Sequence, residues 1–211
     1  MPENEPSGAI LLVVSGPGGA GKSTLCQRLV AASPDAQLSV SATTRSPRGG
    51  EEDGVHYFFL AREEFEKRIA EGAFAEHAEV AGDLYGTPRD FLDERLAAGV
   101  DVVLDIDVQG AMQVREAYGD RAVLVFVVPP DRAVLEARLS GRGTDSPGRV
   151  AERMALAERE IEAARSGCYD YLVVNDEVGE ALKELGAIRR AERSRLPREG
   201  SMAAWVLKTW T

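Results

Sequence analysis

The chain has 211 residues, 44% of them hydrophobic, which suffices for one medium-sized α/β domain with small insertions. Its 25 basic and 35 acidic residues give a formal net charge of −10, which argues against a nucleic-acid partner because such binding neutralises many phosphates. The start of the chain is acidic, unlike a signal peptide, and no apolar run approaches the roughly 18 residues of a membrane span. With two widely spaced cysteines, Cys26 and Cys168, we expect a cytoplasmic protein with reduced thiols and no membrane partner.

The first predicted elements flank a glycine-rich loop. Residues 9–15 are an apolar run that predicts a buried strand, and residues 24–32 predict a helix that ends before Pro34. Between them, residues 16–23 match G-x-x-x-x-G-K-[ST], the phosphate-binding P-loop. In such a loop Lys22 reaches the β- and γ-phosphates, and the Ser23 hydroxyl helps to hold Mg²⁺. This pattern predicts a nucleoside triphosphate ligand but leaves its acceptor open.

Further strand-like runs follow at residues 37–41, 102–107, 122–128 and 171–174, with helical patterns between most of them. This alternation predicts a parallel sheet covered by helices on both faces. Asp131 is expected to cap a helix that ends at Gly141, and Pro147 to begin a longer helix that runs to about Arg165.

Two segments interrupt the alternation. Residues 41–99 are rich in charge and turns, with a strand-like run at 55–60 and a short helix at 62–71, and predict a small mixed insertion. Residues 141–148 join two helices through glycine, arginine and proline, a composition that suits a lid over substrate. The tail, residues 194–211, carries Trp205 and Trp210 and stays unassigned.

Two carboxylates follow the apolar run at residues 102–104. Asp105 and Asp107 are two residues apart, so on a strand both would point to one face. At the carboxyl end of a central strand this face is where ligands bind in open α/β sheets. We therefore expect an acidic pair near the triphosphate and its metal.

Arginines mark two further candidate sites. Arg45 and Arg48, with Tyr57 nearby, suit a phosphate group because guanidinium binds phosphate oxygens in bidentate fashion, although solvated surface charges would give the same pattern. The second group flanks the predicted lid in two pairs, each four residues apart on a helix. Its members either stabilise a transferred phosphoryl group, with Arg149 favoured by spacing, or form ordinary helix ion pairs; they are Arg138, Arg142, Arg149 and Arg153.

Together these motifs resemble the guanylate kinases, which phosphorylate GMP with ATP, from about residue 10 to residue 184. The matching segments are residues 16–24, 40–48, 54–57, 84–87, 104–110, 138–143 and 174–176. The resemblance implies an α/β fold: a P-loop kinase core with a parallel sheet between helices, a small mixed GMP-binding insertion and a short lid. The implied core comprises residues 1–40, 100–137 and 154–193, the GMP-binding module 41–99, and the lid 138–153.

The resemblance also implies residue roles. The transferred phosphoryl group would be surrounded by Lys22, Arg138, Arg142 and Arg153, with Mg²⁺ held by Ser23 and, through water, by Asp105. ATP would contact Gly16, Pro17, Gly18, Gly19, Ala20, Gly21, Lys22, Ser23, Thr24 and, near the adenine, Asn175. The GMP phosphate would be held by Arg45, Arg48, Tyr57 and Tyr85, with Glu51 supporting that loop. The guanine would be read by Ser41, Glu76, Thr87 and Asp107. Many members have serine where this chain has Gly18.

The chemistry of guanine fits this assignment. One edge of guanine presents two donors, N1–H and the 2-amino group, and a carboxylate can only accept. Adenine has an unprotonated N1 there, so Glu76 would lose its partner, and a site built on such hydrogen bonds discriminates strongly. Hydroxyls of Ser41 and Thr87 can donate to the guanine O6.

Three other interpretations fit these motifs less well. A guanylate-kinase-like protein-interaction module would lose P-loop or base-reading residues, whereas this chain keeps Lys22, Arg45 and Glu76 together. A GTPase switch would explain the D-x-x-G at residues 107–110, but the required N-K-x-D does not occur. A kinase for another phosphorylated acceptor would lack the base readers. Self-association is left open by the sequence.

Overall fold

The computed structural model describes residues 8–80, 82–141, 147–165 and 167–195. Its centre is a five-stranded sheet with the order β2-β7-β1-β8-β9, in which every pair of neighbours is parallel. The strands are β1 (Leu11–Ser15), β2 (Ala36–Leu38), β7 (Asp101–Asp105), β8 (Ala122–Val128) and β9 (Tyr171–Val174). The predicted parallel sheet is confirmed, and its carboxyl ends all lie at one edge of the sheet.

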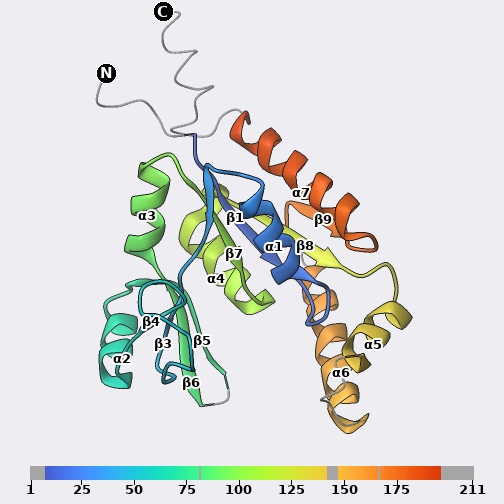
Figure 1. The fold of residues 1–211 in the computed structure, drawn as a ribbon, viewed down its shortest axis with the longest axis horizontal. Helices are drawn as coiled ribbons and strands as arrows, with labels where there is room; N and C mark the ends of the chain where they lie inside the picture. Colours follow the sequence, from blue (N-terminus) through green and yellow to red (C-terminus); the bar gives the residue numbers. More distant parts are fainter. Residues whose placement is uncertain (1–7, 81, 142–146, 166, 196–211) are drawn as a thin grey trace, which may run out of the picture.

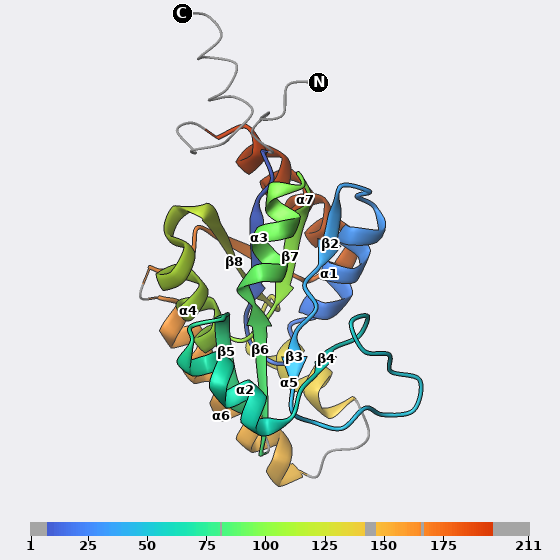
Figure 2. The same cartoon turned by 90° about the vertical axis from the view of Figure 1, so that its left-hand side faces the viewer.

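Helices cover both faces of this sheet because β1 is apolar on both sides. Leu12 and Val14 pack against α1 (Lys22–Ala31) and α7 (Val178–Arg193). Leu11 and Val13 belong to a second core with α3 (Arg89–Ala97) and α4 (Val108–Tyr118), which a short 3-10 helix (Gly119–Arg121) follows. Figure 2 shows α4 and α1 on opposite sides of the sheet, an arrangement typical of doubly wound α/β folds.

Residues 41–99, here called the inserted module, carry their own sheet, with the order β4-β3-β6-β5 and both parallel and antiparallel pairs. Its elements are β3 (Ala42–Thr43), β4 (Phe58–Phe59), α2 (Arg62–Ala70), β5 (Phe74–Val80) and β6 (Asp83–Pro88). A separate small core holds it together, in which the Phe65 and Phe74 rings stack 4.4 Å apart. The expected mixed insertion is therefore present.

Two helices project from the opposite side of the core. They are α5 (Arg132–Ser140) and α6 (Pro147–Ala164), and they pack through Leu135, Leu139, Met154 and Ala157. As expected, Asp131 caps α5, because its Oδ1 accepts the Val134 N–H at 2.8 Å. Residues 142–146, most of the predicted lid loop and with them Arg142, lie outside the described residues.

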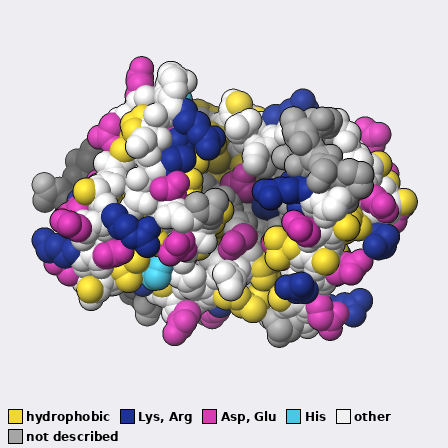
Figure 3. Space-filling view, turned by 90° about the horizontal axis from the view of Figure 1, so that it is seen from below, with side chains coloured by type: hydrophobic (Ala, Val, Ile, Leu, Met, Phe, Trp, Pro, Cys, Tyr) yellow, Lys and Arg dark blue, Asp and Glu magenta, His cyan; other side chains and the backbone are white. Residues whose placement is uncertain are grey.

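The inserted module and the α5–α6 pair lie on opposite sides of the carboxyl edge of the sheet (Figure 1). The surface is hollowed between them, and both Lys or Arg and Asp or Glu side chains line this hollow (Figure 3). Among the described residues, no helix is long and apolar enough to cross a membrane.

Several element boundaries differ from the sequence-based expectation. The strand expected at residues 102–107 ends at Asp105, and Asp107 instead caps α4, where its Oδ1 accepts the Gly110 N–H at 2.8 Å. The prediction that both carboxylates share one strand face is therefore wrong, because a helix begins where the strand was extended. The strand expected at 55–60 shortens to Phe58–Phe59, and the hairpin of β5 and β6 was not anticipated.

Candidate active site

The P-loop wraps closely against neighbouring backbone, which explains two of its glycines. Gly16 has a φ of 140°, and a Cβ there would lie 2.1 Å from the Val127 carbonyl oxygen. Gly21, at the start of α1, has a φ of 87°, and its Cβ would lie 2.4 Å from Asn175 Nδ2. Only glycine fits such a backbone at such a distance, so the loop shape depends on both positions.

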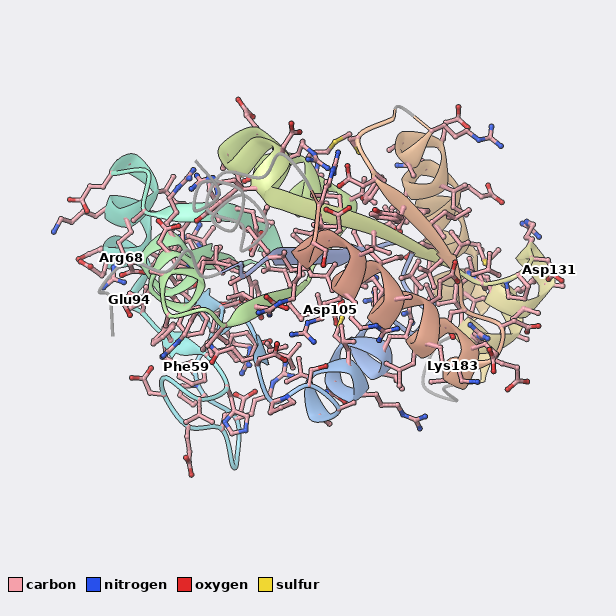
Figure 4. All side chains as sticks on the ribbon, turned by 90° about the horizontal axis from the view of Figure 1, so that it is seen from above. Phe59, Arg68, Glu94, Asp105, Asp131 and Lys183 are labelled. Atoms are coloured by element: carbon pink, nitrogen blue, oxygen red, sulfur yellow. The ribbon has the colours of Figure 1, made fainter. Side chains whose placement is uncertain are left out.

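Lys22 and Ser23 follow the loop on the first turn of α1. Lys22 Nζ donates to the carbonyl oxygens of Gly16, at 2.6 Å, and Pro17, at 3.3 Å. The Ser23 hydroxyl donates to Asp105 Oδ2, which joins the P-loop helix to the end of β7. Asp105 lies near the centre of the molecule, between Phe59 of the inserted module and Asp131 before α5 (Figure 4).

The Ser23–Asp105 pair fits a magnesium ion by its donor chemistry. Mg²⁺ prefers oxygen ligands and takes only one or two from protein, since phosphates and water supply the rest. A hydroxyl and an exposed carboxylate beside a phosphate loop meet that requirement. The residues present are therefore suited to the ion that the P-loop motif implies.

The end of β9 is fastened to the same loop. Asn175, 2% exposed, donates from Nδ2 to the Ala20 carbonyl oxygen at 2.7 Å. Its Oδ1 is buried and has no hydrogen-bond partner within the described parts of the chain. Arg138 of α5 donates to the carbonyl oxygens of Asn175, at 2.9 Å, and Asp176, at 3.2 Å. The structure thus joins the P-loop, the β9–α7 turn and the predicted lid.

The other two lid arginines that the structure describes lie on α6. Arg153 approaches the P-loop, with its Nη2 3.8 Å from where a Cβ of Gly18 would lie. Arg149, one turn earlier, has an exposed side chain. Of the two, Arg153 is therefore the arginine that lies at the donor site.

Across the hollow, Arg45 is held in a preformed arrangement. Its Nη1 and Nη2 donate to the two oxygens of Glu51, at 3.0 and 2.9 Å, and its guanidinium lies 5.4 Å from the Tyr57 ring centre. The Arg45 bonds lower the pKa of Glu51 to about 2, and the Glu51 bonds in turn raise the pKa of Arg45. Glu51 therefore stays ionised and fixes the arginine at neutral pH.

The remaining polar groups of this loop are arranged around that pair. The Arg48 backbone N–H donates to Glu51 at 2.7 Å, while the Arg48 side chain is exposed. Tyr57 and Tyr85 meet edge to face with their centroids 6.1 Å apart, and Tyr85, after Glu51, adds to the raised pKa of Arg45. The structure therefore brings Arg45, Glu51, Tyr57 and Tyr85 together, although Tyr85 is distant in sequence.

A buried carboxylate lies deeper in the inserted module. Glu76, 7% exposed, accepts the Thr87 hydroxyl at 2.6 Å, and the two residues pair across β5 and β6. Burial raises the pKa of Glu76, and the nearby Asp107 charge adds to that shift. Because the Thr87 proton points to Glu76 here, Thr87 orients the carboxylate in addition to any contact with a base. Ser41 is half-buried just before β3, and its carbonyl oxygen accepts the Phe58 N–H.

Two side chains near the P-loop were missed from sequence. Glu160 of α6 is partly buried, and burial raises its pKa although the charge of Lys22 opposes the rise, while Tyr169 donates to Ser15 Oγ at 3.1 Å. Burial raises the pKa of Tyr169 to about 12. Glu160 lies seven residues after Arg153, so helical periodicity could have placed both on one face.

The arrangement brings a phosphate loop with its lysine and metal ligands opposite an arginine grip and a buried hydrogen-bond acceptor. A triphosphate on one side and a phosphorylated acceptor on the other could meet between them. Such a site performs phosphoryl transfer by alignment and charge neutralisation.

Comparison with known proteins agrees with this chemistry. The family model described as guanylate kinase matches residues 9–192. A guanylate kinase of Symbiobacterium thermophilum is 50% identical over 198 residues, covering 94% of this chain and 92% of that protein. One of Anaeromyxobacter dehalogenans is 53% identical over 186 residues, covering 88% and 82%. The crystal structure of guanylate kinase from Anaplasma phagocytophilum has a TM-score of 0.68 at 34% identity, covering 89% of this chain and 88% of that one. This chain therefore belongs to the guanylate kinase family.

Proposed function

We propose that this chain transfers the γ-phosphate of ATP to GMP, giving ADP and GDP, within purine nucleotide metabolism and GMP recycling in the cytoplasm. One observation carries the proposal. The P-loop with Lys22 follows β1 at the carboxyl edge of the core sheet, and the Arg45–Glu51 pair and Glu76 belong to the inserted module beside that edge (Figure 1). A donor site and a site for a phosphorylated guanine nucleotide thus share one space.

On the donor side, the P-loop amides and the amino end of α1 bind the phosphates of ATP. Lys22 exchanges its two carbonyl partners for β- and γ-phosphate oxygens, whose charge offers a stronger hydrogen bond. Ser23 and Asp105 would hold Mg²⁺, Asp105 through water, and the ion supplies charge neutralisation at the triphosphate. Asn175 borders the adenine.

On the acceptor side, Arg45, Arg48, Tyr57 and Tyr85 hold the GMP phosphate. Glu51 restrains Arg45 before substrate arrives, so little side-chain freedom is lost on binding. The hydroxyls of the two tyrosines add donors to phosphate oxygens that each guanidinium leaves open. The preformed pair explains why a carboxylate belongs in a phosphate site.

Guanine recognition follows from the chemistry of Glu76 and Asp107. Their carboxylates accept from guanine N1–H and the 2-amino group, while Ser41 donates to O6; Thr87 would donate to O6 only after its single hydroxyl proton turns away from Glu76. Because Glu76 is buried, adenine would leave it facing another acceptor without solvent to compensate. The base site therefore rejects AMP rather than merely preferring GMP.

Transfer needs no covalent intermediate. The GMP phosphate oxygen attacks the γ-phosphorus in line, while Lys22 with Arg138, Arg142 and Arg153 stabilises the charge on the equatorial oxygens. We assign the lid to residues 138–153 and GMP binding to residues 41–99. Closure of both over the core would exclude water as a competing acceptor.

The test is ADP release from ATP and Mg²⁺ with GMP as acceptor. The wild-type chain is expected to turn over, and Lys22→Ala to lose about 10²- to 10³-fold or more in kcat, the cost of one electrostatic donor. Lys183→Ala is a matched control, because Lys183 is exposed on α7 and pairs with the equally exposed Glu180. Wild-type protein that releases no GMP-dependent ADP would overturn the proposal.

A further inference from the structure

One edge of the small sheet in the inserted module faces helices instead of a strand. In the order β4-β3-β6-β5, β5 is the last strand, so among the described residues one of its edges has no strand beside it. Such an edge presents backbone N–H and C=O groups that need other partners. Here side chains of α3 and α4 supply them, and β5 lies beside α4 (Figure 2).

The Gln113 side chain of α4 takes the place of a neighbouring strand at His77. Its Oε1 accepts the His77 N–H at 3.0 Å, and its Nε2 donates to the His77 carbonyl oxygen, also at 3.0 Å. A primary amide presents a donor and an acceptor together, as a paired strand residue does. Arg89 Nε, on α3, donates to the Phe74 carbonyl oxygen at 2.9 Å. The backbone of β5 is therefore held by helix side chains at two points.

The clamped residue is next to a predicted guanine reader, and its helix begins with the other. His77 directly follows Glu76 on β5, while Asp107 caps α4 six residues before Gln113. Gly110, midway between them, marks a close approach, because its Cβ would lie 3.1 Å from Glu76 Oε2. One helix thus carries one reader, approaches the second and clamps the strand of the second.

The separation of these two carboxylates needs support from elsewhere. Burial raises the pKa of Glu76, and the charge of Asp107 adds to that rise, so the two groups repel each other when both are ionised. A hydrogen bond also weakens steeply away from its best distance and angle. Both carboxylates can meet one guanine edge only if β5 is held at a fixed place beside α4.

We propose that Gln113 is a positioning residue for guanine recognition, which sets the spacing of Glu76 and Asp107 by clamping the His77 backbone to α4. The inference rests on the proposed function, since it names what holds the base site in shape. Both hydrogen bonds that the structure describes for the Gln113 side chain go to β5. Its effect is therefore on GMP and not on ATP.

The deciding variants are Gln113→Met and Gln113→Glu. A methionine side chain keeps the length of glutamine and makes neither bond, and a glutamate keeps an acceptor but sets a charge against the His77 carbonyl oxygen. Gln113→Ala would be less informative, because Gln113 lines a cavity from which water could replace the amide. Met112→Ala is the control, since Met112 is adjacent on α4 and 36% exposed.

Calorimetry gives the Kd for GMP and for ATP, each alone, and initial rates give kcat/KM for GMP and for AMP. Gln113→Met should raise the Kd for GMP roughly tenfold, the loss of two neutral hydrogen bonds, and lower the GMP-to-AMP ratio of kcat/KM by a similar factor. Gln113→Glu should weaken GMP binding at least as much. The Kd for ATP should not change in either variant, and Met112→Ala should match wild type throughout.

Unchanged GMP affinity in Gln113→Met would overturn the proposal, and so would equal losses of ATP and GMP affinity, which indicate general destabilisation. In the Glu76→Gln background, Gln113→Met should weaken GMP binding less than in wild type, because the carboxylate that it positions is gone; full additivity would contradict the proposal. If Gln113→Met does not fold, Gln113→Asn, one methylene shorter, breaks the same clamp and should show the same losses.

This inference and the proposed reaction fail separately. The Kd for GMP is measured without ATP, so a wild-type chain that binds GMP but releases no GMP-dependent ADP overturns the reaction and leaves the clamp to be judged by its own variants. A wild-type chain that phosphorylates GMP, with variants that bind GMP equally well, overturns the role of Gln113 alone.

Discussion

The Glu76 carboxylate is buried in the inserted module with one hydrogen-bond donor, Thr87, for its two oxygens. Because burial raises its pKa, the native state holds the Glu76 proton more tightly than the unfolded chain does. The associated stability is present below the unfolded pKa and is lost as pH rises through the folded one. Burial therefore opposes ionisation of Glu76 in the free protein, and guanine donors would offset that cost.

Glu76→Gln should separate the stability of this site from its function. At neutral pH the variant is expected to melt at a higher temperature than wild type, and the difference should shrink as pH falls through the raised Glu76 pKa. Its KM for GMP should rise roughly tenfold to a hundredfold, because an amide presents a donor where guanine needs an acceptor. Thermal unfolding against pH and initial-rate kinetics check the two halves. Unchanged GMP kinetics would refute the assigned base reader.

Gly110→Ala offers a second test on the same carboxylate. A Cβ at Gly110 would lie 3.1 Å from Glu76 Oε2 and 3.3 Å from Ile106 Cδ1, so the carboxylate must shift. The KM for GMP should rise severalfold while that for ATP stays constant. Gly179→Ala is the matched control, since Gly179 is also helical and has nothing within 4 Å of its Cβ position. Equal kinetics of the two variants would contradict the placement of Glu76.

At the scale of elements, the turn after β9 fastens two parts of the donor site. Asn175 bonds the P-loop at Ala20, and Arg138 of α5 bonds the carbonyl oxygen of Asn175. The first interaction connects the β9–α7 turn to the eight-residue loop, and the second connects α5 to that turn. The geometry of the ATP site therefore depends on β9 and α5 as well as on its own glycines.

Asn175→Ala should loosen that connection. It removes a buried hydrogen bond and opens space next to Gly21, so the Kd for ATP is expected to rise about tenfold. Calorimetric titration with ATP measures this directly. Because the hydrogen bonds that the structure describes for Asn175 are with Ala20, Val128 and Arg138, GMP binding should not change. A variant with wild-type ATP affinity would show that the β9–α7 turn does not support the loop.

The sequence predicted those elements that a short stretch of residues defines by itself. The P-loop is defined by spacing, the apolar runs of β1 and β8 by burial on both faces, and α5 by its Asp131 cap. The β5–β6 hairpin was missed because Phe74–Val80 contains glutamates and a histidine. These polar residues obscure the alternation of apolar and polar side chains that predicts a strand. Asp107 was wrongly assigned to the strand that ends as β7, because it instead caps the helix α4 that follows.

The candidate site likewise has a part that the sequence predicts and a part that depends on tertiary packing. Residues within one motif, such as Arg45 and Glu51, lie together as expected. Contacts between distant elements could not be read from spacing: Arg138 bonds the β9–α7 turn, and Tyr169 bonds Ser15 at the end of β1. They depend on how α5 and α6 pack against the sheet, which is a tertiary property. Arg142 lies outside the described residues, and its role stays a prediction.

At the scale of the whole molecule, a charged network closes the end of the sheet opposite the site. Asp101, fully buried, accepts the Ile10 N–H at 2.9 Å and bonds with Arg189, at 2.5 Å, and Arg193, at 2.8 Å. Both arginines also contact Asp35. This network joins α7 to β1, β7 and the start of β2, so it supports the core without contacting either nucleotide.

Arg189→Ala should therefore reduce stability and leave catalysis intact. Removing Arg189 leaves the buried Asp101 carboxylate with Arg193 as its cationic partner, so the loss in the free energy of unfolding should approach about 3–5 kcal/mol, the cost of a fully broken buried ion pair. Arg132→Ala, whose pairs with Glu136 and Glu158 are exposed, should cost at most about 1 kcal/mol. Urea unfolding measures both, and kcat at low temperature should match wild type. A large loss of kcat in folded Arg189→Ala would contradict this separation of stability from chemistry.

The central claim is that the inserted module selects guanine for a phosphate that the P-loop donates. The most direct measurement is the ratio of kcat/KM for GMP to that for AMP in the wild-type chain, with ATP and Mg²⁺ saturating. A site whose buried carboxylate requires a donor at N1 predicts a ratio on the order of 10⁴. A ratio near one would contradict the account, since it would mean that Glu76 and Asp107 do not read the base.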